Sequence, residues 1–160
     1  MNTGPAGSVT ELAGPTLEQR ITRLEDLEAV KDVTARYAAA VSKGWNGKTI
    51  DLAAIGSVFA SDARWESRDM GLAADGVDAI IASLPRSTSM VEFSMHAFLN
   101  PVITLDENTA SGSWLMWIAS VIDHAPRAVY LSADMTYTRT DQGWRIQTVD
   151  VQHGLSLPPG

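Results

Sequence analysis

The second half of the chain contains four consecutive β-rich stretches, and this succession restricts the fold more than any other feature of the sequence. The stretches span residues 91–105, 109–123, 128–140 and 143–153. Short runs of turn-forming residues separate them, such as Asp141-Gln142-Gly143. Because consecutive strands joined by short turns pair antiparallel, the sequence predicts an antiparallel meander in this half.

The first half begins with a helical pattern. Apolar residues recur three or four positions apart from Leu17 to Val41, which predicts one long amphipathic helix. Thr16 is suited to open this helix, and Gly44 is expected to end it as a C′ glycine. A break near residues 24–26 would leave a short leading helix.

Shorter elements are expected between the long helix and the meander. Helices are predicted at residues 52–60 and 77–84, the latter stopped by Pro85, and a short strand at 62–67. A glycine-containing loop is expected at 69–76. Helices that precede a run of strands are typical of an α+β protein.

Composition excludes several classes of protein. The chain has 160 residues, a net charge of -7 and no cysteine. We expect one domain at residues 17–154, between a flexible leader at 1–16 and a flexible tail at 155–160. Neither nucleic acid nor an anionic membrane is expected as a partner of an acidic chain, and disulfides or cysteine-ligated metals are excluded. Without a signal peptide or an apolar span of sufficient length, the protein is expected to be cytoplasmic.

One strand of the meander is apolar on both faces. Trp114 and Met116 alternate with Leu115 and Trp117, so we expect neither face of this strand to be exposed to solvent. The helices can cover one face only. We therefore expect the other face to contact a second copy of the chain, in a homodimer or homotrimer.

Several segments together resemble the NTF2-like superfamily, and within it the SnoaL-like and scytalone-dehydratase-like group. These segments are LEAVKDVTARYAAAV, VFASDARWE, GVDAI, MHAFLNPVITLD, TASGSW and YTRTDQGWRI, in this order. The resemblance implies a cone, in which a strongly bent, mostly antiparallel sheet wraps around three helices and leaves a deep apolar pocket. Members include dehydratases, dehydrochlorinases, ketosteroid isomerases, epoxide hydrolases and polyketide cyclases, typically without metal or organic cofactor, and also proteins without catalytic activity.

His96 is the strongest candidate for a catalytic residue, because imidazole titrates near neutral pH and transfers protons. The resemblance implies that this histidine is a base, normally paired with an aspartate late in the first helix, five residues after a tyrosine or lysine. Here Tyr37 occupies the first of these positions and Ser42 the second. Asp134 is the best substitute carboxylate, unless it faces solvent. Tyr37 is expected to donate a hydrogen bond to a substrate oxygen, unless it only packs in the core.

Candidate substrate-binding residues are Ser42, Trp65, Phe98, Asn100, Trp114 and Met116. The alternative for Asn100 is a bulge created by Pro101, and for the aromatic residues simple core packing. The three histidines are scattered, so no metal site is expected. These residues favour a cofactor-independent lyase or isomerase acting on a small hydrophobic cyclic substrate of polyketide or steroid type. The alternative is a non-catalytic ligand-binding or accessory domain; epoxide hydrolysis would need an Asp-Arg-Asp arrangement that the sequence does not reveal.

Overall fold

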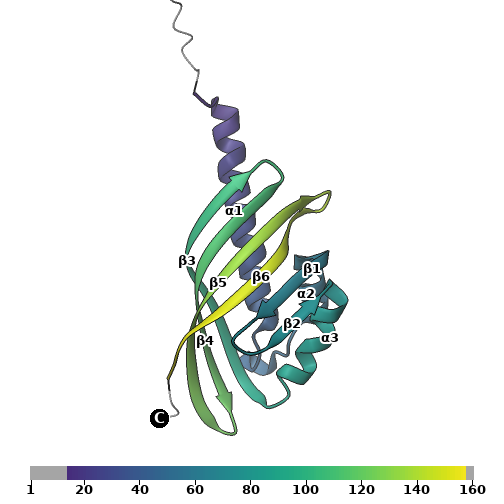
Figure 1. Cartoon of the computed structure of the whole chain (residues 1–160), viewed down its shortest axis with the longest axis vertical. Coiled ribbons are helices and arrows are strands. Elements are labelled where there is room, and N and C mark those ends of the chain that lie inside the picture. The colour runs from purple at the N-terminus through teal and green to yellow at the C-terminus, as the bar shows by residue number, and fades with distance from the viewer. Residues whose placement is uncertain (1–13, 158–160) are drawn as a thin grey trace, which may run out of the picture.

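The computed structural model describes residues 14–157, which form helices packed against one side of a curled sheet (Figure 1). The helices are α1 (Leu17–Val41), a short 3-10 turn (Trp45–Gly47), α2 (Leu52–Val58) and α3 (Val77–Ser87). The strands are β1 (Phe59–Ser67), β2 (Leu72–Asp75), β3 (Val91–Asp106), β4 (Thr109–Ile122), β5 (Ala125–Thr140) and β6 (Gly143–Leu157). None of the helices in this part of the chain combines the length and apolar character needed to cross a membrane.

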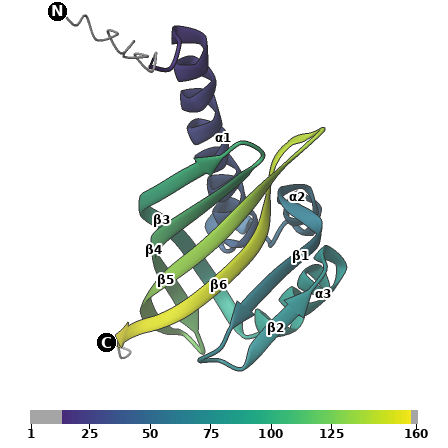
Figure 2. The ribbon, with the colours of Figure 1, turned by 45° about the horizontal axis from the view of Figure 1, so that its top comes forward.

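The six strands form one sheet in the order β2-β1-β6-β5-β4-β3. Strands β3 to β6 are the antiparallel meander that the sequence predicts, and β1 joins it by pairing parallel to β6. Figure 2 shows this sheet curling across α1, with α2 and α3 beside β1 and β2. The architecture is the α+β cone that the resemblance implies.

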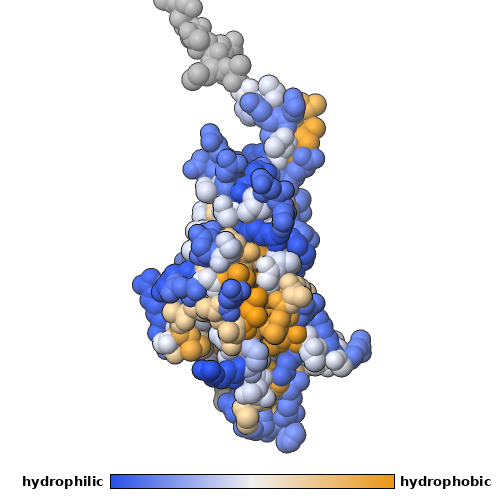
Figure 3. Space-filling view, turned by 90° about the vertical axis from the view of Figure 1, so that its right-hand side faces the viewer, coloured by the Kyte–Doolittle hydropathy of each residue, from blue (hydrophilic) through white to orange (hydrophobic). Residues whose placement is uncertain are grey.

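Helix α1 is continuous from Leu17 to Val41, as the apolar stripe predicts, and the alternative of a break at residues 24–26 does not occur. Thr16 and Gln19 form a capping box that satisfies the free amides of its first turn. The C-terminal half buries residues such as Val33 completely. The N-terminal half projects beyond the sheet and leaves Leu17 69% exposed; Figure 3 shows apolar residues along one edge of this projection.

Gly44 does not end α1 as a C′ glycine. The helix ends at Val41, and Ser42 is already extended. Gly44 lies in the following turn with a φ of 94°, and a Cβ there would lie 2.9 Å from the Cα of Phe93. Glycine is therefore required by close backbone approach between this turn and β3.

Two expectations for the middle of the chain are also corrected. Residues 72–75, expected to lie in a loop, form β2, because they pair antiparallel with the end of β1. Pro85 does not stop α3, which continues to Ser87. The last turn closes beyond the proline through a 3.0 Å hydrogen bond from the Thr88 N–H to the Leu84 carbonyl.

The end of the meander is longer than expected. The turn before β5 contains only Asp123 and His124, both with positive φ, so β5 already begins at Ala125. Strand β6 continues to Leu157, where it pairs with Ala128. Residues 155–157 are therefore strand rather than irregular tail, while residues 1–13 and 158–160 lie outside the described part.

Both faces of β4 are apolar, as expected, but they differ in burial. Trp114 and Met116 are buried against the helices, whereas Leu115 on the opposite face is 55% exposed. Trp117 on that outer face stacks on Tyr130 of β5, with ring centroids 6.1 Å apart. We call this apolar region around Leu115, Trp117 and Tyr130 the outer sheet patch.

Candidate functional site

An apolar cavity of about 480 Å³ lies between α1, α3 and the strands β1, β2 and β3. Its size is within the range of small-molecule sites. Tyr37, Trp65 and His96 line it from α1, β1 and β3, and Leu84 lines it from α3. We call it the inner cavity. It brings two of the three predicted catalytic residues, Tyr37 and His96, into one space.

A second cavity, of about 520 Å³, lies between α1 and β3. Ser42, Phe98 and Trp114 line it, together with His96. The His96 ring therefore borders both cavities, because it lies on the inner face of β3 against the end of α1.

Ser42 determines which nitrogen of His96 carries the proton. The Ser42 hydroxyl donates to the Ala38 carbonyl at 2.7 Å, which uses its only hydrogen. Its oxygen accepts the backbone N–H of His96 at 3.1 Å and lies 3.3 Å from His96 Nδ1. This last contact is a hydrogen bond only if Nδ1 is the donor. The neutral ring is therefore assigned a proton on Nδ1 and a free lone pair on Nε2.

The contact between Ser42 and His96 is held by the backbone. Lys43, which follows Ser42, forms an antiparallel bridge with Ser94, two residues before His96. Its N–H donates to the Ser94 carbonyl at 3.1 Å, and the Ser94 N–H donates back at 2.9 Å. The end of α1 and this part of β3 are thus joined directly.

Lys48 adds a positive charge behind the same residues. Its ammonium donates to the carbonyl oxygens of Ala39 and Ser42, the latter at 2.7 Å. It thereby binds carbonyls left free at the end of α1, whose last turn contains no basic residue. Burial lowers the pKa of His96 to about 4, and the charge of Lys48 contributes to this decrease. His96 is consequently a neutral imidazole at neutral pH.

Tyr37 lines the inner cavity, and no acceptor for its hydroxyl hydrogen lies among residues 14–157. The indole N–H of Trp65 donates to the Tyr37 hydroxyl oxygen at 3.1 Å. The hydroxyl hydrogen itself is not used in this contact and is available to a bound molecule. Burial raises the pKa of Tyr37 to about 12, so the phenol stays protonated. Tyr37 is therefore a neutral hydrogen-bond donor.

Asp134 does not replace the missing carboxylate, and this expectation is wrong. It lies on the outer face of β5, between the buried Ala133 and Met135, and accepts a 2.6 Å hydrogen bond from Ser113. Strand alternation directs it away from the helices and from His96. In the part of the chain that the structure describes, no acidic residue lines either of the two cavities.

Asn100 is not a substrate-binding residue in either cavity. It is exposed, has a φ of 48°, and lies where the β3–β4 register shifts between Leu99 and Val102. This is the bulge that the sequence offered as the alternative.

Of the remaining residues predicted to bind substrate, some line a cavity and others are buried in the core. Trp65 lines the inner cavity, whereas Phe98 and Trp114 line the second cavity. Met116 is buried in the core and borders neither. Ser42 acts on His96 rather than on a ligand, because its hydroxyl is fully engaged.

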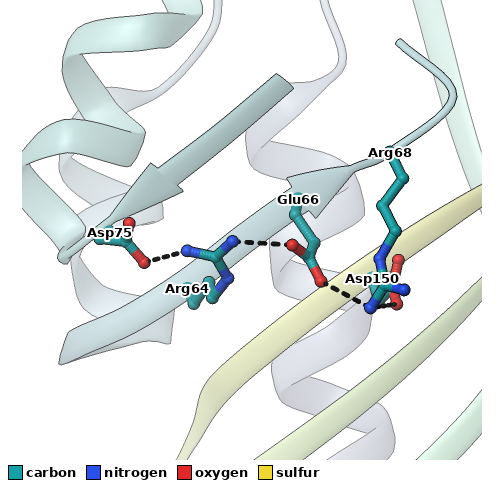
Figure 4. Close-up of polar contacts among 5 residues, drawn as sticks. All are labelled: Arg64, Glu66, Arg68, Asp75 and Asp150. Carbon is teal, nitrogen blue, oxygen red and sulfur yellow. Dashed lines mark hydrogen bonds and ion pairs between the residues drawn. The ribbon is translucent and has the colours of Figure 1, made fainter. Parts of the chain in front are cut away.

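A cluster of charged residues lies on β1, β2 and β6, outside both cavities (Figure 4). Arg64 pairs with Asp75 and, at 2.8 Å, with Glu66, while Arg68 bridges Glu66 and Asp150. This cluster resembles the acid–Arg–acid arrangement of an epoxide hydrolase, but it lies on the face of the sheet opposite to the two cavities. Within residues 14–157, no group of three acidic or histidine side chains could hold a metal ion.

Sequence reasoning missed Lys48 and Arg86. Lys48 is a single charge in a loop, and only the fold brings it behind His96. Arg86 lines the inner cavity because α3 continues past Pro85, which the sequence predicted to be a stop. No motif marks either residue.

Comparison with known proteins gives the family. Residues 22–150 match the SnoaL-like domain. No curated protein is significantly similar to the chain.

Solved structures share the fold at low sequence identity. A proposed aromatic ring hydroxylase from Novosphingobium aromaticivorans is 24% identical, with a TM-score of 0.71 over 86% of this chain and 94% of that one. A proposed scytalone dehydratase from the same species is 15% identical, with a TM-score of 0.75 over 86% and 90%. A hexachlorocyclohexane dehydrochlorinase, LinA-type3 from Novosphingobium barchaimii, is 13% identical, with a TM-score of 0.75 over 87% and 93%. Given the domain match over most of its length, the chain belongs to the SnoaL-like family of the NTF2-like superfamily.

Proposed function

We propose that the protein is a cofactor-independent enzyme of lyase or isomerase type that removes a proton from a small hydrophobic cyclic substrate in the inner cavity. The observation that supports this most is the pair Tyr37 and His96 on one apolar cavity, with the His96 tautomer set by Ser42. A neutral base and a neutral hydrogen-bond donor are what proton abstraction next to a carbonyl requires.

In the proposed step, His96 Nε2 takes a proton from a carbon adjacent to a substrate carbonyl. The electron pair of the broken C–H bond forms a carbon–carbon double bond, and the carbonyl oxygen becomes an oxyanion that accepts the Tyr37 hydrogen bond. Return of the proton to another carbon gives isomerisation. Loss of a leaving group from the β carbon gives elimination, with the proton passing from His96 to that group.

The charges around His96 favour substrates that stabilise their own anion. Among the described residues that line the two cavities there is no carboxylate to pair with the imidazolium formed in this step, and Lys48 is already positively charged. Charge separation is thus less favourable than in an Asp–His pair. A carbonyl that delocalises the negative charge towards Tyr37 compensates for this difference.

Two of the structural neighbours are consistent with the proposal. The names dehydrochlorinase and scytalone dehydratase both denote elimination reactions. At 13% and 15% identity these neighbours support the fold, and the reaction of this chain rests on its own residues.

Hydrogen–deuterium exchange tests proton abstraction without knowledge of the physiological product. The α-hydrogens of 2-tetralone, a cyclic ketone, are followed by NMR in D₂O with catalytic amounts of protein. We expect enzyme-dependent exchange that decreases at least about 100-fold in His96→Gln, since general bases contribute about 10²–10⁴-fold. His124→Gln is the matched control, because His124 lies in an exposed turn beside Glu92.

The second candidate function is ligand binding without catalysis, and Ser42 in place of an aspartate favours it. In that case 2-tetralone would bind to the folded protein, but its exchange would be the same in wild type and His96→Gln. Such a result would reject the proposed enzyme.

A further inference from the structure

The inner cavity has an unusual charge for this protein. The chain contains 19 acidic and 12 basic residues, yet the described residues that line this cavity include no acidic side chain. Of residues 14–157, Arg86 in the last turn of α3 is the one lysine or arginine that lines it. The cavity is therefore electropositive at its α3 side in an acidic molecule.

Arg86 is also the donor that remains free at this end of the cavity. Ser83, Ser87 and Thr88 line the same side, but their hydroxyls donate to carbonyls of α3 at 2.7, 3.2 and 2.6 Å. Within residues 14–157 the Arg86 guanidinium has no hydrogen-bond or ion-pair partner. Arg64, by contrast, is paired with two carboxylates.

We infer that the inner cavity binds an apolar ring compound carrying a carboxylate, and that Arg86 pairs with this group. The ring would occupy the apolar part of the cavity, with Tyr37 and His96 facing it from α1 and β3. A guanidinium matches a planar carboxylate with two parallel hydrogen bonds. The inference rests on the proposed function only in taking the inner cavity as the substrate site, and it makes Arg86 a specificity-determining residue.

Binding of two probes of the same shape tests the inference. 2-Naphthoate and 2-naphthamide share a ring system, and only the first is charged. We expect wild type to bind naphthoate about fivefold more tightly than naphthamide in calorimetric titrations, which corresponds to a favourable exposed ion pair. Arg86→Gln should remove this difference by weakening naphthoate alone, and Arg86→Lys should retain part of it.

Two further variants locate the binding. Arg20→Gln is the matched control, because Arg20 is exposed on the projecting part of α1. Leu72→Trp enlarges a side chain that lies on the same face as Trp65 and lines the inner cavity from a partly exposed strand position, and it should weaken the binding of both probes. Equal affinity of the two probes, or equal weakening of both by Arg86→Gln, would overturn the carboxylate inference and leave the proposed proton transfer standing. If Leu72→Trp changed neither affinity, the inner cavity would not be the site, and both proposals would fail.

Discussion

The Ser42 hydroxyl oxygen accepts the backbone N–H of His96 and lies 3.3 Å from its Nδ1, although 54 residues separate the two in the chain. Its own hydrogen is used on the Ala38 carbonyl. Serine thereby performs one of the two tasks of an aspartate, orientation of the imidazole, without supplying charge.

Ser42→Ala should allow the neutral His96 ring to carry its proton on either nitrogen. Nitrogen-15 NMR of the wild type should show Nδ1 as the protonated nitrogen, whereas the variant should show a mixture. Activity should decrease about fivefold, corresponding to one hydrogen bond of about 1 kcal/mol. Ser57→Ala is the control, since Ser57 makes the same kind of hydroxyl-to-carbonyl bond in α2 away from His96. An unchanged NMR signature in Ser42→Ala would contradict the assigned tautomer.

Lys48→Met should raise the pKa of His96, because a positive charge is removed from its surroundings. The acid limb of the pH–rate profile should move to higher pH. The free energy of unfolding should decrease by about 0.3–1 kcal/mol, through loss of a cation at the end of α1. Lys43→Met, which removes a contact to the Thr88 carbonyl, should leave the acid limb in place. Identical profiles in the two variants would argue against the role of Lys48.

The stability of the protein should decrease as the pH falls from about 6.5 to about 4. The pKa of His96 is lowered from 6.5 to about 4 in the folded protein, so the unfolded chain binds more protons in this window. The stabilisation is complete above pH 6.5 and is lost progressively below it, by an amount on the order of 3 kcal/mol. Urea denaturation of wild type and His96→Gln at several pH values measures this. The free energy of unfolding of His96→Gln should not show this decrease between pH 6.5 and 4. If the curves of unfolding free energy against pH were parallel for the two proteins, the assignment of this decrease to His96 would be refuted.

Tyr37→Phe should lower kcat about tenfold, because one hydrogen bond to the developing oxyanion is lost. The wild-type rate should not decline between pH 8 and 10, since burial raises the pKa of Tyr37 to about 12. Exchange of 2-tetralone hydrogens provides the measurement. Tyr130→Phe, on the exposed outer face, is the control and should retain full activity. A Tyr37→Phe variant as active as wild type would show that the phenol only packs.

The outer sheet patch should hold two or three copies of the chain together, as its exposed apolar residues favour. Leu115→Asp should produce a monomer in light scattering at micromolar concentration. Leu17→Asp changes the same residue type at a more exposed position on the projecting helix, and should leave the assembly intact. A monomeric wild type would disprove the prediction.

The sequence predicted the helices, the meander and the cone, because these depend on local periodicity, turn residues and motif order. The pair of Tyr37 and His96 on one cavity also followed, since both occupy positions that the resemblance implies. Asp134 was misassigned because its orientation depends on strand register rather than on residue type. Lys48 and Arg86 could not be found, since each reaches the site through a contact or a helix extension that no local pattern encodes.

The bridge between Lys43 and Ser94 has a consequence for amide hydrogen exchange. Both backbone amides are donors across the junction of α1 and β3, so neither can exchange while this junction is closed. Fraying of the projecting part of α1 would expose other amides and leave these two protected. Their exchange rates therefore report how often Ser42 and His96 separate, as distinct from how often the helix end opens.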